Sequence, residues 1–170
     1  MRHVLFALAA FWLATPVAIS QPVTDPLLEH FSGTWVLRGT LAGKQTTHDI
    51  TSQWILGHQY LQIHERSRET DSKGQPQYEA LVLVGWEAAS SQYQCLWLDS
   101  TGGGGLAGHA VALGKRDGQS IPFVFKEPDG TVSFVNTFSY DSATNSWTWE
   151  LDNVKKGTRV PFGRVRLTQR

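Results

Sequence analysis

The sequence predicts an all-β protein, an antiparallel up-and-down β-barrel of about ten strands with a short N-terminal capping helix. Short β-rich runs separated by turn residues follow one another from residue 34 to residue 168, and no segment after Gly33 keeps a helical period. The connections are too short for crossover helices, so consecutive strands should pair antiparallel. A meander leaves two unpaired edges unless it closes, which favours a barrel; a sandwich with Greek-key connections is the alternative.

The first 20 residues have the pattern of a secretory signal peptide. Arg2 precedes a mostly apolar run over residues 4–17, and Ala18 and Ser20 supply small residues before the predicted cleavage site. The run is about 14 residues long, whereas a membrane span needs roughly 20. We therefore expect an exported protein, in a bacterial periplasm or secreted, with no integral membrane segment in the mature chain.

The mature chain, residues 21–170, is predicted to be one nearly neutral domain. The full chain has 15 Lys and Arg against 15 Asp and Glu, and loss of Arg2 with the leader leaves a net charge of −1. Without a basic field, binding to nucleic acid is not expected. The single cysteine, Cys95, excludes an internal disulfide framework and a multi-cysteine zinc site, and we expect it to be a buried small hydrophobe.

The residues before the first strand predict a short helix. Thr24 or Asp25 is placed to cap it, Pro26 suits its first turn, and Gly33 suits its end. Three apolar residues at helical spacing form its expected buried side: Leu27, Leu28 and Phe31.

Ten candidate strands follow the helix. They cover residues 34–42, 46–56, 59–69, 77–86, 92–99, 106–114, 119–126, 131–140, 147–153 and 159–168. Several of the turns between them end in a glycine, as at Gly118 and Gly130, where a positive φ costs little.

Two motifs give the chain a resemblance to known families. Residues 31–37 contain Gly33-Thr-Trp35, which resembles the Gly-x-Trp signature of lipocalins and fatty-acid-binding proteins, where the Trp plugs one barrel end. Residues 78–102 contain Gly85-Trp-Glu87, a Tyr and then Trp-Leu-Asp-Ser-Thr-Gly, and resemble the bacterial lipocalin-like domains of unknown function. The resemblance implies a calycin-like β-barrel, which agrees with the strand pattern.

Two ligand sites of these families have no counterpart here. Fatty-acid-binding proteins hold a carboxylate with Arg-x-Tyr on the last strand, where this chain reads Arg164-Val-Arg166-Leu. Nitrobindins, the haem-binding barrels of the group, use a His late in the chain, whereas the last His here is His109. No cofactor is therefore expected.

The aromatic residues predict a cavity for a small hydrophobic or amphipathic molecule. An aromatic side chain buries about 150–250 Å², and such side chains either fill a tapering barrel or line a pocket. Asp99 shares a face with Trp97 and either orients a ligand or caps the following turn. Arg166 reaches Trp35 only if its face of the last strand points inward. The candidate ligand-binding residues are Trp35, Trp86, Trp97, Asp99, His109, Trp149 and Arg166.

No local motif for catalysis or metal binding stands in the sequence. The histidines lack metal-ligand spacing, and neither Gly-x-Ser-x-Gly nor Ser-x-x-Lys occurs, so no catalytic residue and no metal ligand is assigned. We expect a non-catalytic binding module. The alternatives are an enzyme that uses Asp99, His109 or His64 in the same cavity, and a packed barrel with a structural or interaction role. His64 is predicted to face outward, because Leu61 and Ile63 face inward.

Overall fold

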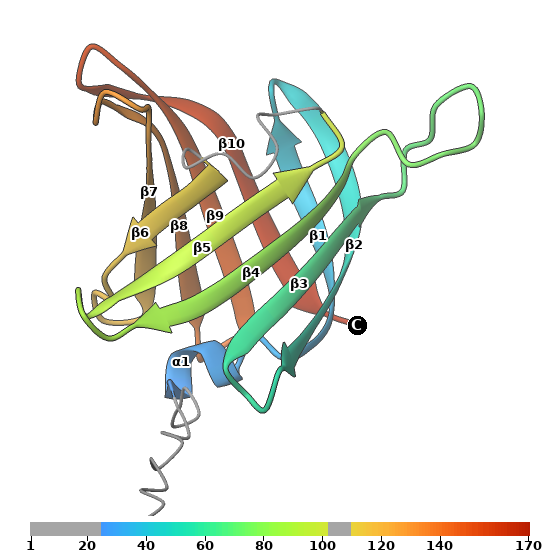
Figure 1. The fold of residues 1–170 in the computed structure, drawn as a ribbon. Helices are drawn as coiled ribbons and strands as arrows, with labels where there is room; N and C mark the ends of the chain where they lie inside the picture. Colours follow the sequence, from blue (N-terminus) through green and yellow to red (C-terminus); the bar gives the residue numbers. More distant parts are fainter. Residues whose placement is uncertain (1–24, 102–109) are drawn as a thin grey trace, which may run out of the picture.

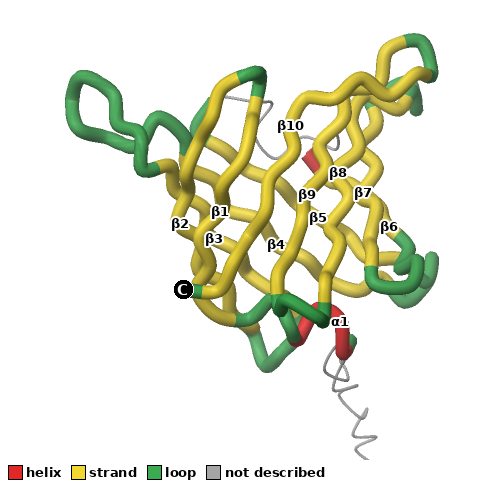
Figure 2. Tube along the Cα trace, turned by 180° about the vertical axis from the view of Figure 1, so that it is seen from behind, coloured by secondary structure: helices red, strands yellow, loops and turns green. Residues whose placement is uncertain are grey.

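Ten antiparallel strands close into a barrel, and a short helix covers one of its two ends (Figure 1, Figure 2). The structure is a computed structural model that describes residues 25–101 and 110–170. The predicted leader and His109 lie outside the described residues. The predicted fold class is confirmed, and the sandwich is excluded because the strands form one continuous closed sheet.

The elements lie close to their predicted positions. In chain order they are α1 (Pro26–Glu29), β1 (Gly33–Leu41), β2 (Lys44–Ile55), β3 (Tyr60–Ser67), β4 (Glu79–Glu87), β5 (Gln92–Asp99), β6 (Val111–Gly114), β7 (Ser120–Lys126), β8 (Val132–Asp141), β9 (Ser146–Lys155) and β10 (Thr158–Gln169). The predicted strand over residues 106–114 is described only in its second half, as β6.

Each strand pairs with its neighbours in sequence, and β1 closes the barrel against β10. The seam runs from Trp35 opposite Gln169 to Leu41 opposite Gly163. Closure satisfies the backbone groups that two free edges would leave unpaired. The turns have the expected geometry, with φ of +59° at Gly118 and +85° at Gly130.

Side chains alternate between the interior and the outer surface along each strand. In β3, Leu61, Ile63 and Glu65 are buried, whereas His64 is partly exposed and contacts Glu79 at 2.6 Å. The prediction that His64 faces outward is therefore confirmed. The same alternation carries a carboxyl group, that of Glu65, into the barrel interior.

The helix and a group of aromatic residues fill the half of the barrel nearest α1. Of the two predicted caps, Asp25 is the one that caps the helix, and its carboxylate accepts a hydrogen bond from the backbone N–H of Leu27 at 2.7 Å. Leu27, Leu28 and Phe31 are almost fully buried, and the Phe31 ring centroid lies 4.8 Å from that of Trp147. Trp35 Nε1 donates to the carbonyl of Phe31 at 2.8 Å. This end of the barrel is solidly packed.

Asp25→Ala should lower the free energy of unfolding by about 1–2 kcal/mol, because the helix N-terminus loses its capping acceptor. Asp25 also accepts from Arg116 Nη1 at 3.0 Å, so Asp25→Asn separates the two contributions. Asparagine keeps the cap and loses only the charge, and it should cost less than alanine. Urea unfolding of the wild-type protein and the two variants measures both losses of free energy of unfolding. Equal losses for the two variants would show that capping contributes nothing.

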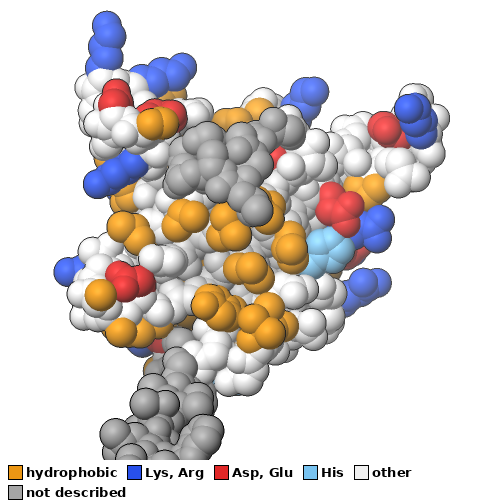
Figure 3. Space-filling model, in the orientation of Figure 1, with side chains coloured by type: hydrophobic (Ala, Val, Ile, Leu, Met, Phe, Trp, Pro, Cys, Tyr) orange, Lys and Arg blue, Asp and Glu red, His pale blue; other side chains and the backbone are white. Residues whose placement is uncertain are grey.

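Apolar side chains also gather on the outer surface of the barrel. Figure 3 shows them over the face formed by β4, β5 and β6, where Leu81 and Leu113 are more than one-third exposed. Leu81 stands opposite Leu98, and Leu83 stands opposite Leu96. No helix among the described residues is long and apolar enough to cross a membrane.

Candidate ligand-binding site

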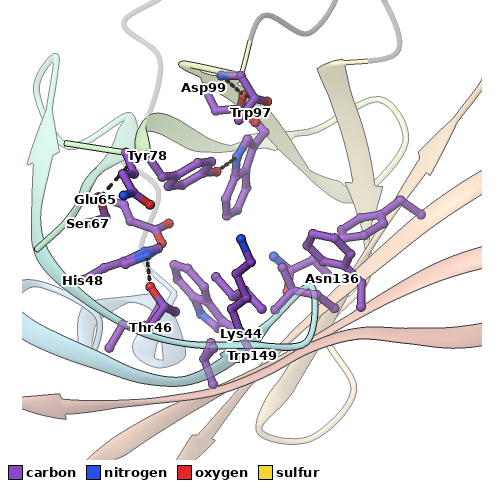
Figure 4. Close-up of a pocket in the computed structure, with 18 of the residues that line it drawn as sticks. Lys44, Thr46, His48, Glu65, Ser67, Tyr78, Trp97, Asp99, Asn136 and Trp149 are labelled. Carbon is purple, nitrogen blue, oxygen red and sulfur yellow. Dashed lines mark hydrogen bonds and ion pairs between the residues drawn. The ribbon is translucent and has the colours of Figure 1, made fainter. Parts of the chain in front are cut away.

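The half of the barrel opposite α1 contains a cavity of about 750 Å³ (Figure 4). This volume lies within the range of about 300–1,000 Å³ usual for small-molecule sites. Side chains from both ends of the chain and from its middle line it, since the closed sheet brings their strands together. The barrel is thus filled in one half and hollow in the other.

The two sides of the cavity differ in chemistry. One wall, from β1 and β7 to β10, is mainly apolar and includes Leu37, Phe125, Phe134, Leu151 and Val165. The other wall, from β2, β3 and the residues that follow β3, is mainly polar. It includes Thr46, His48, Glu65, Ser67 and Glu69. A molecule in this space would meet hydrogen-bonding groups along one side and hydrocarbon along the other.

Four residues of the polar wall form a chain of hydrogen bonds. The Thr46 hydroxyl donates to Glu69 Oε2 at 3.1 Å, and His48 Nε2 lies 2.7 Å from the same hydroxyl oxygen. On its other side, His48 Nδ1 contacts Glu65 Oε1. His48 and Glu65 are each only 2% exposed, so the pair is held away from bulk water.

This series of hydrogen bonds determines where the protons lie. Thr46 has one hydroxyl hydrogen and gives it to Glu69, so His48 Nε2 must be the donor toward Thr46. The remaining proton lies between His48 Nδ1 and Glu65 Oε1. Burial raises the pKa of Glu69, but hydrogen bonds from its own N–H, the Thr47 N–H and the Thr46 hydroxyl outweigh burial and lower that pKa. Glu69 is therefore an anion at neutral pH.

A tyrosine and a tryptophan lie beside these hydrogen-bonded residues. Trp97 Nε1 donates to the Tyr78 hydroxyl oxygen at 3.0 Å, and the Tyr78 ring stacks on His48 with centroids 5.6 Å apart. Burial and the nearby Glu65 carboxyl raise the pKa of Tyr78, so its hydroxyl stays protonated at neutral pH. Figure 4 shows both rings at the cavity wall.

Three buried polar atoms of lining residues have no hydrogen-bond partner among the described residues. They are Glu65 Oε2, Asn136 Oδ1 and Trp149 Nε1. Each of the three residues is at most 2% exposed. Because buried polar groups are nearly always paired, such a concentration around one cavity indicates a place where a bound molecule completes the hydrogen bonding.

Three of the residues predicted to bind a ligand line this cavity, namely Trp97, Asp99 and Trp149. Trp149 packs in the interior against Phe138, with ring centroids 4.5 Å apart. Asp99 lies at the rim, where its carboxylate accepts from the backbone N–H of Thr101 at 2.9 Å. Of the two roles considered for Asp99, the turn cap is the one its hydrogen bonds display.

The structure places three other candidates away from the cavity. Trp35 is buried in the packed half, where it contacts Phe31. Trp86 lies toward the other end of β4 and is 44% exposed. Arg166 lies on the outer surface and donates to the Thr144 hydroxyl at 2.8 Å, because the inward positions of β10 are taken by Val165 and Leu167. The remaining candidate, His109, is outside the described residues.

Sequence reasoning missed the central residues of the polar wall. His48, Glu65 and Asn136 were not among the predicted ligand contacts, although one signal was available. Glu65 is two residues beyond Ile63 on a strand whose alternate residues are apolar, and a charged residue in phase with an apolar face points into the barrel. The partners of Glu65 lie on other strands, so only the folded chain reveals them.

The described residues contain no group of three or more His, Cys, Asp or Glu side chains placed to hold a metal ion. Cys95 is fully buried, as predicted, and burial raises the pKa of its thiol. A thiol in this state is a poor nucleophile, so Cys95 is a structural residue of the barrel wall.

Neither a protein-family model nor a curated protein matches this chain. The class of molecule therefore rests on the fold and the cavity. Both define a ten-stranded antiparallel barrel, plugged at one end and compatible with a calycin-like fold, with a buried aromatic cluster beside an internal space.

Proposed function

We propose that this chain is an exported binding protein that holds one small amphipathic molecule inside its barrel. The observation that carries the proposal is the cavity of about 750 Å³ with an apolar wall facing a polar wall. An apolar wall supplies binding free energy in proportion to the area removed from water, and polar groups fix the orientation of the molecule.

The placement of the polar groups favours one shape of ligand. Three buried atoms of the lining have no hydrogen-bond partner among the described residues, and they lie on β3 (Glu65 Oε2), β8 (Asn136 Oδ1) and β9 (Trp149 Nε1). A molecule with a polar group only at one end would leave some of these atoms unpaired, at a cost of about 1–3 kcal/mol each. His48, Glu65 and Tyr78 form one contiguous surface along the wall. The ligand that fits is compact, with an apolar face and more than one hydrogen-bonding group.

A fluorescent apolar probe tests for binding in the cavity. N-phenyl-1-naphthylamine should bind to the purified protein with one site per chain. When the probe itself is excited, and not the tryptophans of the protein, its fluorescence emission should rise on binding. Ser133→Trp places a large side chain among the lining residues of β8 and should lower the affinity for the probe by about tenfold or more. Thr137→Trp on the same strand does not touch the cavity and serves as the control.

Native mass spectrometry of the protein after mild purification provides a second readout. A bound molecule should survive in the spectrum of the wild-type protein and be lost or diminished in Ser133→Trp. If the probe fails to bind and no molecule is retained, the barrel is not a binding protein and the proposal is wrong.

Export is tested by the mass of the chain. Expressed with its full sequence in a bacterium, the protein should be recovered from the periplasm or medium with Gln21 as its first residue. Ala18→Arg places a large charged side chain three residues before that site and should block cleavage. Recovery of an uncleaved wild-type chain would contradict this part of the proposal.

The His48–Glu65 pair favours one second function, acid–base catalysis. A buried imidazole and carboxyl that share a proton beside a cavity are suited to moving a proton to or from a bound molecule. A molecule extracted from the protein would then exchange a carbon-bound hydrogen in deuterated water when wild-type protein is added back. Exchange that persists with His48→Asn would exclude this function.

A further inference from the structure

We propose that the ligand carries a protonated amine, and that Glu65 Oε2 is the acceptor that anchors it. This inference rests on the proposed binding function and names the class of molecule: a compact aromatic or alicyclic amine. Its ammonium group would lie on the polar wall and its apolar body against Phe134 and Trp149.

The charges around the cavity favour a cation. Among the described residues its lining includes four carboxylate residues, Glu65, Glu69, Asp99 and Glu127. The basic groups are Lys44, which is exposed at the rim, and His48, which shares one proton with Glu65 so that this pair is neutral as a whole. Glu69, Asp99 and Glu127 therefore outnumber Lys44 around the cavity. An anionic ligand would meet repulsion from these carboxylates, which is strongest at the partly buried Glu69 because burial reduces screening by water.

The geometry of Glu65 makes it the anchor. Its Oε1 atom is used by His48, while Oε2 is buried and has no hydrogen-bond partner among the described residues. Figure 4 shows the carboxyl group reaching toward the space between His48, Tyr78 and Trp97. Leaving a buried carboxylate oxygen unpaired is costly, and an ammonium N–H supplies the missing bond in its stronger, charge-assisted form.

The aromatic rings near Glu65 suit the same group. Tyr78 and Trp97 are hydrogen-bonded to each other beside the Glu65 carboxyl, and Trp149 meets Trp97 edge to face with centroids 5.8 Å apart. A cation within about 6 Å of such a ring is attracted by its electron-rich face. The unpaired Trp149 N–H indicates, in addition, one acceptor atom on the body of the ligand.

Three probes with one aromatic body and different charges test the inference. They are 1-naphthylmethylamine, which is a cation at neutral pH, 1-naphthylmethanol, which is neutral, and 1-naphthylacetate, which is an anion. Titration calorimetry with the full-length mature protein should show the amine binding about tenfold or more tightly than the alcohol, and the acetate most weakly.

Matched variants locate the anchor. Glu65→Gln keeps a hydrogen-bonding group beside His48 Nδ1 and should remove most of the preference for the amine, with the affinity for the alcohol changed by less than about threefold. Glu127→Gln removes the same charge at an exposed rim position and should change the affinity for the amine by less than about fivefold. Lys44→Gln should leave the amine bound equally or more tightly.

The outcomes separate this inference from the proposed function. If the alcohol or the acetate binds as tightly as the amine, the cavity binds ligands but the amine anchor is wrong. If neither the three naphthyl probes nor N-phenyl-1-naphthylamine bind, the proposed binding function itself is wrong. Should Glu65→Gln not fold, as judged by circular dichroism, the ranking of the three probes on the wild-type protein decides.

Discussion

Phe31→Ala is expected to lower the free energy of unfolding by about 3–5 kcal/mol, the range for removing a large aromatic side chain from a packed core. The Phe31 side chain has no exposed surface and lies at the centre of the plug beside α1. Its ring centroid is within 6.0 Å of those of Trp35, Phe138, Trp147 and Trp149. None of these rings is free to collapse into the space, because they are fixed on three strands of the barrel, β1, β8 and β9.

Urea unfolding followed by tryptophan fluorescence measures this loss, since the emitting side chains surround the substituted residue. Phe31→Leu retains most of the volume and should cost less than half as much as alanine. Leu56→Ala changes a side chain that is 72% exposed and should have little effect. A loss below about 1 kcal/mol for Phe31→Ala would show that the plug does not stabilise the barrel.

Gly39→Ala should be the most disruptive substitution for closure of the barrel. A Cβ atom at Gly39 would lie 2.2 Å from the carbonyl oxygen of Arg164 and 2.7 Å from Val165 Cα, so the backbones of β1 and β10 would have to separate. The residue also has a φ of +153°, where a side chain is strained. Overpacking and backbone strain each cost about 1–3 kcal/mol, so we expect the free energy of unfolding to fall by about 3 kcal/mol or more in total.

Gly43→Ala separates strain from collision. Gly43 has a φ of +78°, but apart from its chain neighbours no atom of the described residues lies within 4 Å of the position of an added Cβ, so only the backbone strain applies. This control should lose about 1 kcal/mol. Thermal unfolding monitored by circular dichroism compares the two variants, and equal losses would mean that the close approach of β1 and β10 does not matter for stability.

The two halves of the barrel divide stability and binding between them. The residues with the largest expected effects on stability, Phe31 and Gly39, are not among the residues that line the cavity, whereas Glu65 lines it and has an oxygen with no hydrogen-bond partner in the described part of the chain. Binding sites commonly retain polar groups that lower the stability of the free protein, because a bound molecule supplies their missing hydrogen-bond partners. The variants proposed for the site should therefore change affinity more than stability.

The sequence by itself determined the class of fold. Turn glycines, the alternation of apolar residues and short connections depend only on neighbouring residues. These local rules predicted about ten antiparallel strands and a short helix capped by Thr24 or Asp25, and Asp25 is the cap. They also predicted that His64 faces outward and that Cys95 is buried. Trp97 and Trp149 were singled out for their size and type, and both line the cavity.

Only the tertiary structure decided which polar residues meet inside the barrel. Glu65 contacts His48, 17 positions earlier, and Glu69 accepts from Thr46 across 23 positions, because β2 and β3 pair in a register that no single strand encodes. The direction of Arg166 depended likewise on which face of β10 is inward. Local patterns fix the strands, whereas a site made from side chains of several strands exists only once pairing register and closure bring them together.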